Sequence, residues 1–328
     1  MGPGSFNFEV VEGWGRGPEG REMGGVVPGV AVDSQDRVYV ARRSPPAILV
    51  YDDQGRFLQS WGEDALASPH LLWIGSDDQV YCADSGNHTV RKFSADGEVL
   101  QTLGTPDRPG SPDTPFNQPT RAMLSQSGDL FVADGYGQFR VHRLSPDGQV
   151  LSSWGEGGQG PGQFALPHSL WVDDRRSRVL VMDRENNRIQ IFDFEGIFMG
   201  EWTDVEMPMD MYIDLDDVVY VSEAPSRISI FSPDGELLSR WGEDGSAPGQ
   251  FEDAPHAIWL DSRGDLYVAD WHNDRVQRLS RDGEFVETLP EAAERRAQEK
   301  GEFSSLACGL GSIGPYLSQQ LVGHRIGE

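Results

Sequence analysis

The chain has 328 residues, of which 38% are hydrophobic and 10% aromatic, so it can form one large domain or two ordinary ones. Its 27 basic and 53 acidic residues give a net charge of −26, and no basic run is present to neutralise phosphates, so we expect no nucleic-acid partner. We expect no membrane partner, because no segment approaches the roughly 18 apolar residues of a spanning helix. The first residues lack the apolar core of a signal peptide, and we therefore expect a cytoplasmic protein.

Internal repeats dominate the sequence. Each repeat holds four short apolar runs, and the last two runs are joined by a turn such as "PDG" or "RDG", which is a strong hairpin signal. A proline marks the same phase of each repeat, at intervals of 41 to 50 residues: Pro28, Pro69, Pro119, Pro167, Pro208 and Pro255. The repeats span 26–63, 67–104, 117–156, 165–202, 206–243 and 253–289. This pattern predicts an all-β, six-bladed propeller with four antiparallel strands per blade.

The two ends of the repeat series raise the question of how the ring closes. We expect residues 1–290 to form a single propeller domain. The segment "FNFEVVEGWGR" (6–16) resembles the fourth run of a blade, and "GEFVETL" (283–289) competes with it for the outer edge of the last blade. Residues 291–328 match no blade and are predicted to form a carboxy-terminal tail, with a short helix over 291–300.

Three histidines occur at one phase of the repeat, directly after the marker proline. They are His70, His168 and His256, and they fall in the second, fourth and sixth repeats. The first strand of each blade lines the central channel of a propeller, so these side chains would converge on the axis with threefold symmetry. A lone strand histidine is usually a packed residue, but three at one phase predict a His₃ metal site on the central axis. Zn²⁺ is the expected ion, and another divalent transition metal would also suit imidazole ligands.

Two arginines and a tyrosine follow inner runs near the expected channel mouth. Arg42 and Arg184 can hold a carboxylate in a bidentate manner, and Tyr136 beside a metal ion can serve as a general base. The structural alternatives are ion pairing of the arginines with surface acids and packing of the tyrosine in a sheet.

These motifs resemble a known family. The segments "PHSLWV", "VMDRENNRIQIF" and "GQFALP" resemble the NHL repeat, and the constellation as a whole is similar to the peptidylglycine α-amidating lyases over about residues 20–285. That family cleaves peptidyl-α-hydroxyglycine to a peptide amide and glyoxylate. The resemblance implies zinc bound by the three histidines, with Tyr136 in "DGY" as the base. It also implies substrate-binding roles for Arg184 and for Arg42, with the adjacent Arg43 as the alternative one register away.

The sequence departs from the family at positions that affect the metal and the pocket. The family has an acidic residue for structural calcium where Ala257 stands here, so calcium is not expected. A methionine of the family's pocket wall is replaced by Ala254, and the disulfides and signal peptide of its secreted members are not seen.

Three functions stay open at this point. The first is a zinc-dependent lyase that cleaves a carbinolamide C–N bond in a small-molecule or short-peptide substrate of α-hydroxyglycine type. The second is a metal-dependent hydrolase of esters, lactones or phosphotriesters at the same His₃ site. The third is a non-enzymatic NHL scaffold that binds a protein partner.

Overall fold

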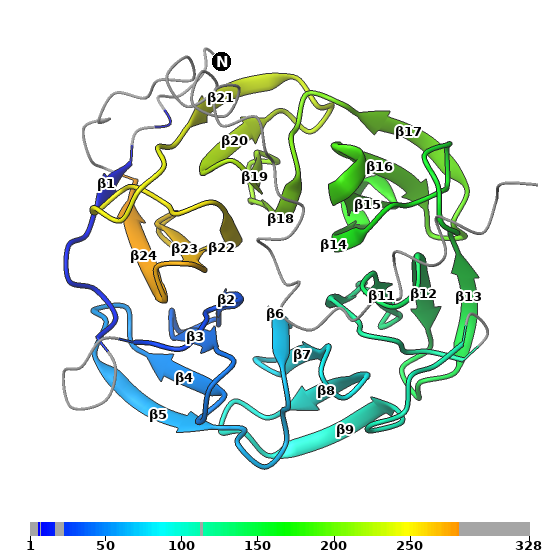
Figure 1. The fold of residues 1–328 in the computed structure, drawn as a ribbon, viewed down its shortest axis with the longest axis horizontal. Helices are drawn as coiled ribbons and strands as arrows, with labels where there is room; N and C mark the ends of the chain where they lie inside the picture. The colour runs from blue at the N-terminus through cyan, green and yellow to red at the C-terminus, as the bar shows by residue number, and fades with distance from the viewer. Residues whose placement is uncertain (1–5, 7, 17–22, 112–113, 282–328) are drawn as a thin grey trace, which may run out of the picture. The chain divides into compact units, whose positions relative to one another are not determined.

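A computed structural model describes residue 6 and residues 8–16, 23–111 and 114–281. In this part of the chain, six four-stranded antiparallel sheets are arranged around a central axis (Figure 1). The prediction of an all-β, six-bladed propeller with four antiparallel strands per blade is confirmed. The predicted tail over 291–328, with its helix over 291–300, lies outside the described residues.

The strands follow the predicted repeats blade by blade. Blade one comprises β2 (Gly29–Val32), β3 (Val38–Ala41), β4 (Ile48–Tyr51) and β5 (Phe57–Trp61), and blade two comprises β6 (Pro69–Ile74), β7 (Val80–Asp84), β8 (Thr89–Phe93) and β9 (Val99–Gly104). Blade three comprises β10 (Arg121–Leu124), β11 (Leu130–Asp134), β12 (Arg140–Leu144) and β13 (Val150–Trp154). Blade four comprises β14 (Pro167–Asp173), β15 (Arg178–Asp183), β16 (Arg188–Asp193) and β17 (Phe198–Trp202), with the 3₁₀ helices η2 (Asp174–Arg176) and η3 (Arg184–Asn186). Blade five comprises β18 (Pro208–Ile213), β19 (Val219–Glu223), β20 (Arg227–Phe231) and β21 (Leu237–Trp241).

Blade six is completed by the amino-terminal segment. It comprises β22 (Pro255–Leu260), β23 (Leu266–Asp270), β24 (Arg275–Ser280) and the outer strand β1 (Glu9–Val10). The strand β1 pairs antiparallel with β24, so that Glu9 faces Ser280 and Val10 faces Leu279 (Figure 1). The first of the two candidate outer strands therefore closes the ring, and the competing segment 283–289 lies outside the described residues.

The repeated Trp-Gly-Glu and Asp-Gly motifs join consecutive blades. Gly97, in the hairpin between the third and fourth strands of blade two, has a φ of 89°, which favours glycine. A Cβ at Gly97 would lie 2.4 Å from the ring of Trp61, at the end of the outer strand of blade one. Gly235 and Trp202 repeat this packing between blades five and four, so each tryptophan covers the hairpin of the next blade.

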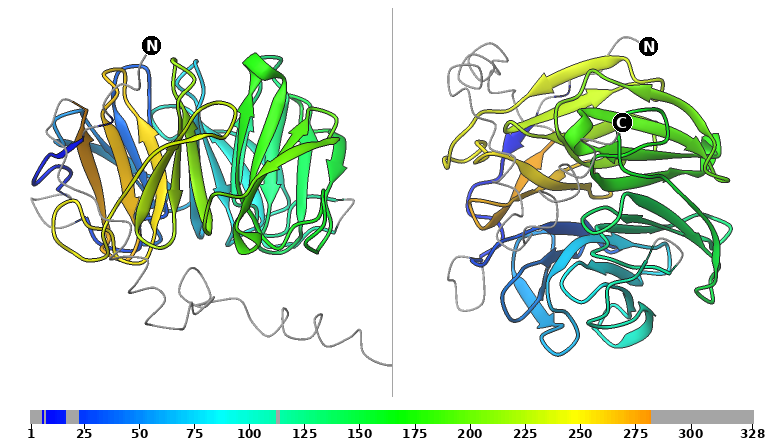
Figure 2. Two further views of the ribbon diagram at one scale, coloured as in Figure 1. Left: turned by 90° about the horizontal axis from the view of Figure 1, so that it is seen from above. Right: turned by 45° about the vertical axis from the view of Figure 1, so that its right-hand side comes forward.

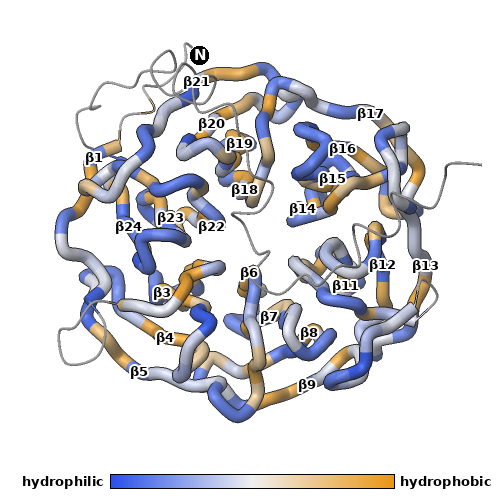
Figure 3. Tube along the Cα trace, viewed as in Figure 1, coloured by the Kyte–Doolittle hydropathy of each residue, from blue (hydrophilic) through white to orange (hydrophobic). Residues whose placement is uncertain are grey.

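The inner strands β2, β6, β10, β14, β18 and β22 contact their neighbours all the way round the axis. Seen from the side, the strands of each blade run between the two faces of the ring (Figure 2). Hydrophobic stretches lie along strands of every blade, and the connecting loops are mainly hydrophilic (Figure 3). The core is therefore built between blades. Among the described residues, no helix has the length and hydropathy needed to cross a membrane.

A β-bulge follows the marker proline in four blades. In blade four Pro167 pairs with Asp183 while Ser169 pairs with Met182, which leaves His168 as the extra residue of β14. The same irregularity occurs at the starts of β6, β18 and β22. A bulge re-aims side chains that a regular pleat would direct elsewhere. All three predicted histidines lie at such bulges.

Candidate functional site

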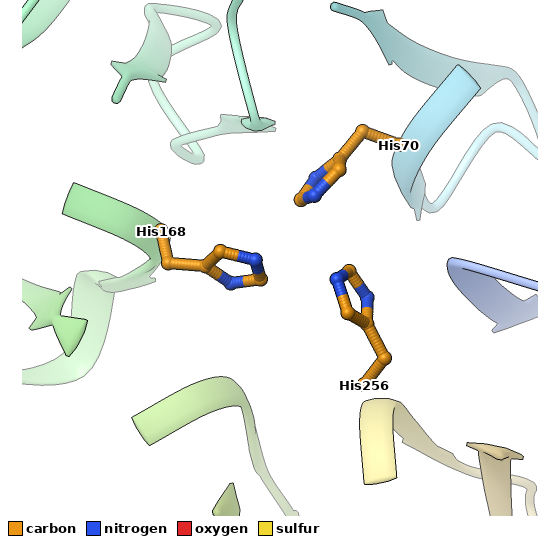
Figure 4. Close-up of side chains that lie close together, drawn as sticks. All are labelled: His70, His168 and His256. Atoms are coloured by element: carbon orange, nitrogen blue, oxygen red, sulfur yellow. The ribbon is translucent and has the colours of Figure 1, made fainter. Parts of the chain in front are cut away.

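The three histidines meet at the axis of the ring. Figure 4 shows their imidazoles pointing toward one another from β6, β14 and β22. The ring centroids are 4.8 Å apart for His70 and His168, 4.9 Å for His70 and His256, and 4.8 Å for His168 and His256. One ring nitrogen from each residue can be chosen so that all three lie within 4.8 Å of one another. The arrangement has the near-threefold symmetry that the alternate-blade pattern predicts.

Each imidazole is oriented by the backbone of the next blade. The Nδ1 atom of His70 lies 2.8 Å from the carbonyl oxygen of Thr120, and that of His168 lies 2.7 Å from the carbonyl oxygen of Met209. The Nδ1 atom of His256 lies 2.7 Å from the carbonyl oxygen of Pro28. Since a carbonyl can only accept, each Nδ1 carries the proton, and each Nε2 keeps a lone pair. Around the ring, imidazoles and carbonyls thus alternate from blade to blade.

Burial keeps these imidazoles neutral. All three side chains are fully buried, and burial is the main reason that their pKa values lie well below the ordinary value. The positive charge of Arg184 lowers the pKa of each of the three further, and Arg43 does so for His70 and His256. A neutral imidazole is the form that binds a metal ion.

The donor set fits a divalent transition metal. Three neutral nitrogen donors converge, and each is backed by a carbonyl acceptor on its other nitrogen, which is the usual outer-shell support of metal-ligating histidines. The Nε2 of His256 is buried without a hydrogen-bond partner, which is costly unless a ligand occupies it. Three protein ligands also leave a coordination position open, as in catalytic zinc sites.

Tyr136 reaches the histidines from blade three. Its hydroxyl oxygen lies 2.9 Å from Nε2 of His70 and 3.2 Å from Nε2 of His168. Gly135 permits this approach, because a Cβ there would lie 2.2 Å from the carbonyl oxygen of Pro167 in blade four. Tyr136 as a residue is only partly buried, unlike the three histidines.

Arg184 opens η3 directly after β15. Its side chain is 2% exposed, and it donates from Nε and Nη2 to Oε1 of Glu185 at 3.1 and 2.7 Å. Its positive charge contributes to the lowered pKa of all three imidazoles. The substrate-binding role of Arg184 stays a prediction.

The adjacent arginines of blade one have different surroundings. The guanidinium of Arg42 donates to the backbone carbonyls of Met23, Pro45 and Pro46, at 2.6, 2.7 and 2.9 Å, so it supports the surrounding loops. Arg43 instead lies near His256, since its Cζ atom is 4.4 Å from the ring centroid of Trp271, which stacks on His256. Arg43 is therefore the one of the two that lies close to a predicted metal ligand, and the substrate-binding role itself stays a prediction.

Trp271 is a site residue that the sequence reasoning missed. Its ring stacks on His256 with centroids 4.4 Å apart and planes 28° apart, and Cζ of Arg43 lies 4.4 Å from the Trp271 ring centroid. It directly follows Asp270 at the end of β23, the repeat phase that Arg184 occupies in blade four. Comparing this phase across the six repeats would have indicated it.

Comparisons with known proteins agree with this architecture. No family model matches the chain. Human NHL repeat-containing protein 3 is 35% identical over 246 residues, which cover 70% of this chain and 65% of that protein. Peptidyl-glycine α-amidating monooxygenase A of Xenopus laevis is 31% identical over 277 residues, 77% of this chain and 28% of that protein. Peptidyl-α-hydroxyglycine α-amidating lyase 1 of Drosophila melanogaster is 34% identical over 149 residues, 42% of this chain and 27% of that protein. The chain therefore spans less than two thirds of each of these relatives.

Solved structures share the fold at lower sequence identity. Virginiamycin B lyase from Staphylococcus aureus superposes with a TM-score of 0.57 and 18% identity, and the match covers 81% of this chain and 84% of that one. This likeness concerns the propeller architecture.

Proposed function

We propose that the chain is a zinc-dependent, lyase-like enzyme. The premise is that it is an NHL-repeat propeller related in sequence to peptidyl-α-hydroxyglycine α-amidating lyases. Its substrate would be a carbinolamide of α-hydroxyglycine type, cleaved at the C–N bond in the central channel. One observation carries this proposal above the others. The three buried imidazoles are each held by a carbonyl at Nδ1, which leaves their Nε2 atoms for a shared ion beside the Tyr136 hydroxyl.

Each residue of the site can take a separate role in such a reaction. His70, His168 and His256 would hold Zn²⁺, which supplies Lewis acidity toward the substrate's hydroxyl oxygen when bound. Tyr136, in its ionised form, accepts the hydroxyl proton, since its oxygen lies among the Nε2 atoms. The C–O bond then becomes a carbonyl, the C–N bond breaks, and the amide nitrogen takes up a proton. No water is consumed.

The two arginines near the ring would bind the substrate's carboxylate. Arg184 is held by Glu185, and Arg43 lies against the Trp271 ring, so both guanidinium groups are pre-oriented. A planar guanidinium matches a carboxylate with two parallel hydrogen bonds, and two such groups would fix the substrate in one orientation. The proposed substrate is therefore a small molecule or short peptide that ends in a free carboxylate next to the reacting carbon.

The proposal is tested by metal content and by one assay. Purified protein should hold about one zinc per chain and release glyoxylate from an N-acyl-α-hydroxyglycine, with both properties lost in His168→Ala. His272→Ala is the matched control, because His272 is an exposed histidine paired with Asp253 outside the ring.

A protein that takes up no zinc even from excess metal would refute the metal centre. A zinc-loaded protein that hydrolyses esters, lactones or phosphotriesters but releases no glyoxylate would replace the lyase with the hydrolase. A zinc-loaded protein inactive on both panels would favour a scaffold.

A further inference from the structure

A buried charged pair lies on the inner strands, at chain positions next to the carbonyl acceptors of the histidine ring. Arg121 begins β10 and directly follows Thr120, and Asp210 in β18 directly follows Met209. Both side chains are fully buried. The Nη1 atom of Arg121 donates to the carbonyl oxygen of Leu72 at 2.8 Å and lies 3.5 Å from Oδ2 of Asp210. One guanidinium on blade three thus reaches blades two and five.

The Asp210 carboxylate also accepts hydrogen bonds from blades four and six. Its Oδ1 accepts from Oγ of Ser169 at 2.8 Å, and its Oδ2 accepts from the backbone nitrogen of Ile258 at 3.3 Å. Burial raises the pKa of Asp210, and the charge of Arg121 opposes that shift. Residues of the inner strands of five blades therefore meet in one buried polar cluster.

The cluster is covalently linked to the groups that orient the histidines. Arg121 follows Thr120, whose carbonyl accepts from His70, and Asp210 follows Met209, whose carbonyl accepts from His168. Ser169 follows His168 itself. Any shift of Arg121 or Asp210 would therefore move the acceptors that set the two imidazole planes.

The same cluster excludes the calcium ion that the family resemblance implies. Calcium binds six to eight oxygen ligands and favours several carboxylates. Here Ala257 offers no carboxylate, and the Leu72 carbonyl and the Asp210 carboxylate are both engaged by the guanidinium of Arg121. The residues present therefore do not fit calcium.

We propose that Arg121 is a built-in cation that ties blades two, three and five together across the channel, in place of a bound divalent ion, and so positions the carbonyls that orient His70 and His168. A buried ion pair contributes little net stability over an apolar pair, but removal of one partner leaves an uncompensated charge. The pair therefore acts mainly by fixing the relative positions of the blades. The tying of the blades is independent of the proposed function, because the melting temperature reports on it without metal or turnover. The zinc-affinity measurement rests on the metal centre proposed above and applies once wild-type protein is shown to bind zinc.

The experiment is a double-mutant cycle on the full chain. Arg121→Met and Asp210→Asn should each lower the melting temperature by about 10 °C, and the double variant should lose clearly less than the sum. Each single variant should also bind zinc about tenfold more weakly in a competition titration with a chromophoric chelator. Arg56→Met is the control, because Arg56 pairs with Asp52 at 2.6 Å within one hairpin of blade one and its side chain is 80% exposed. It should change the melting temperature little and zinc affinity not at all.

A second test measures calcium binding by the wild-type protein and needs no variant. Wild-type protein should contain less than about a tenth of a calcium per chain, and millimolar calcium chloride should not raise its melting temperature above that in magnesium chloride. Stoichiometric calcium, or a calcium-specific rise in melting temperature, would overturn the proposal even if Arg121→Met fails to fold. Strictly additive losses in the cycle, or zinc affinity unchanged in both single variants, would overturn it as well.

Discussion

The Nδ1 atom of His256 donates to the carbonyl oxygen of Pro28, 228 residues earlier in the chain, at 2.7 Å. His256 belongs to blade six and Pro28 precedes the inner strand of blade one, so this bond crosses the seam where the ring closes. The seam is also held at its outer edge by the pairing of β1 with β24. One hydrogen bond therefore serves both ring closure and the orientation of a candidate metal ligand.

The two roles of His256 can be separated with two substitutions. The amide nitrogen of asparagine lies near the place of Nδ1 and can donate to the Pro28 carbonyl, so His256→Asn should keep most of the stability while losing zinc. His256→Ala should lose zinc and also about 1 kcal/mol or more of unfolding free energy, from the missing hydrogen bond and the space left behind. Thermal unfolding and metal analysis of both variants check this. Equal melting temperatures for the two variants would argue against the seam role.

Gly29 occupies the ring phase of blade one, and its lack of a side chain has a clear reason. A Cβ there would lie 2.5 Å from the carbonyl oxygen of His70. Gly29→Ala should therefore push the inner strands of blades one and two apart, at a cost of about 1–3 kcal/mol, and weaken zinc binding. Gly200→Ala is the control, because a Cβ at Gly200 meets nothing within 4 Å. Denaturant unfolding of both variants measures the difference, and a loss of stability at Gly200 alone would contradict the steric account.

Tyr136→Phe removes one oxygen atom from the centre of the site. If the phenol is the base, glyoxylate release should fall by about 10²- to 10⁴-fold, while zinc content stays at the wild-type level because all three histidines remain. The melting temperature should change little, since the substitution keeps the aromatic ring and removes one hydroxyl from a partly buried residue. Loss of zinc together with activity would instead assign the hydroxyl a role in holding the metal site together.

The paired arginines of blade one give opposite expectations. Arg43→Met should raise KM for a carboxylate substrate by about 10- to 100-fold, because a charge-assisted contact near the ring is lost. Arg42→Met should leave KM unchanged and lower stability, because it removes the donor to the carbonyls of Met23, Pro45 and Pro46. Steady-state kinetics and thermal unfolding of the two variants decide between them, and the reverse pattern would return the substrate role to Arg42.

Trp271 should act on the site through His256. Trp271→Ala removes the ring that stacks on the imidazole and against Arg43, and we expect about a tenfold loss of zinc affinity. Trp271→Phe keeps an aromatic face and should recover most of it. The same competition titration measures both variants, and identical affinities for Ala and Phe would show that stacking does not position His256.

The repeat made much of this structure predictable. Phase alone placed His70, His168 and His256 on alternate blades, because a propeller converts equal phase in sequence into equal position around an axis. The same reasoning located Tyr136 and Arg184 at the ends of inner hairpins. These inferences needed only the blade number and the order of strands within a blade.

What phase could not supply is the direction of individual side chains. Arg42 and Arg43 differ by one residue, and only the local backbone decides which guanidinium supports the loop carbonyls and which approaches the ring. The placement of Asp210 could not be read from strand alternation, because the bulge at β18 shifts the register just before it. The partners of Arg121 lie on other blades, at Leu72 and Asp210, and its own strand gives no sign of them. Backbone acceptors such as the carbonyl of Pro28 could not be predicted, because every residue carries a carbonyl and the residue type does not mark which one accepts.

Because imidazoles and carbonyls alternate around the axis, the number of blades in the ring must be even. Each histidine blade needs a carbonyl blade as its next neighbour, so the ring consists of three pairs of blades. Gain or loss of a single blade would set two imidazoles side by side, which leaves a buried Nδ1 proton without an acceptor, or two carbonyls side by side, which leaves one carbonyl without its imidazole donor. Growth or reduction of such a propeller while it keeps its centre would therefore have to proceed two blades at a time.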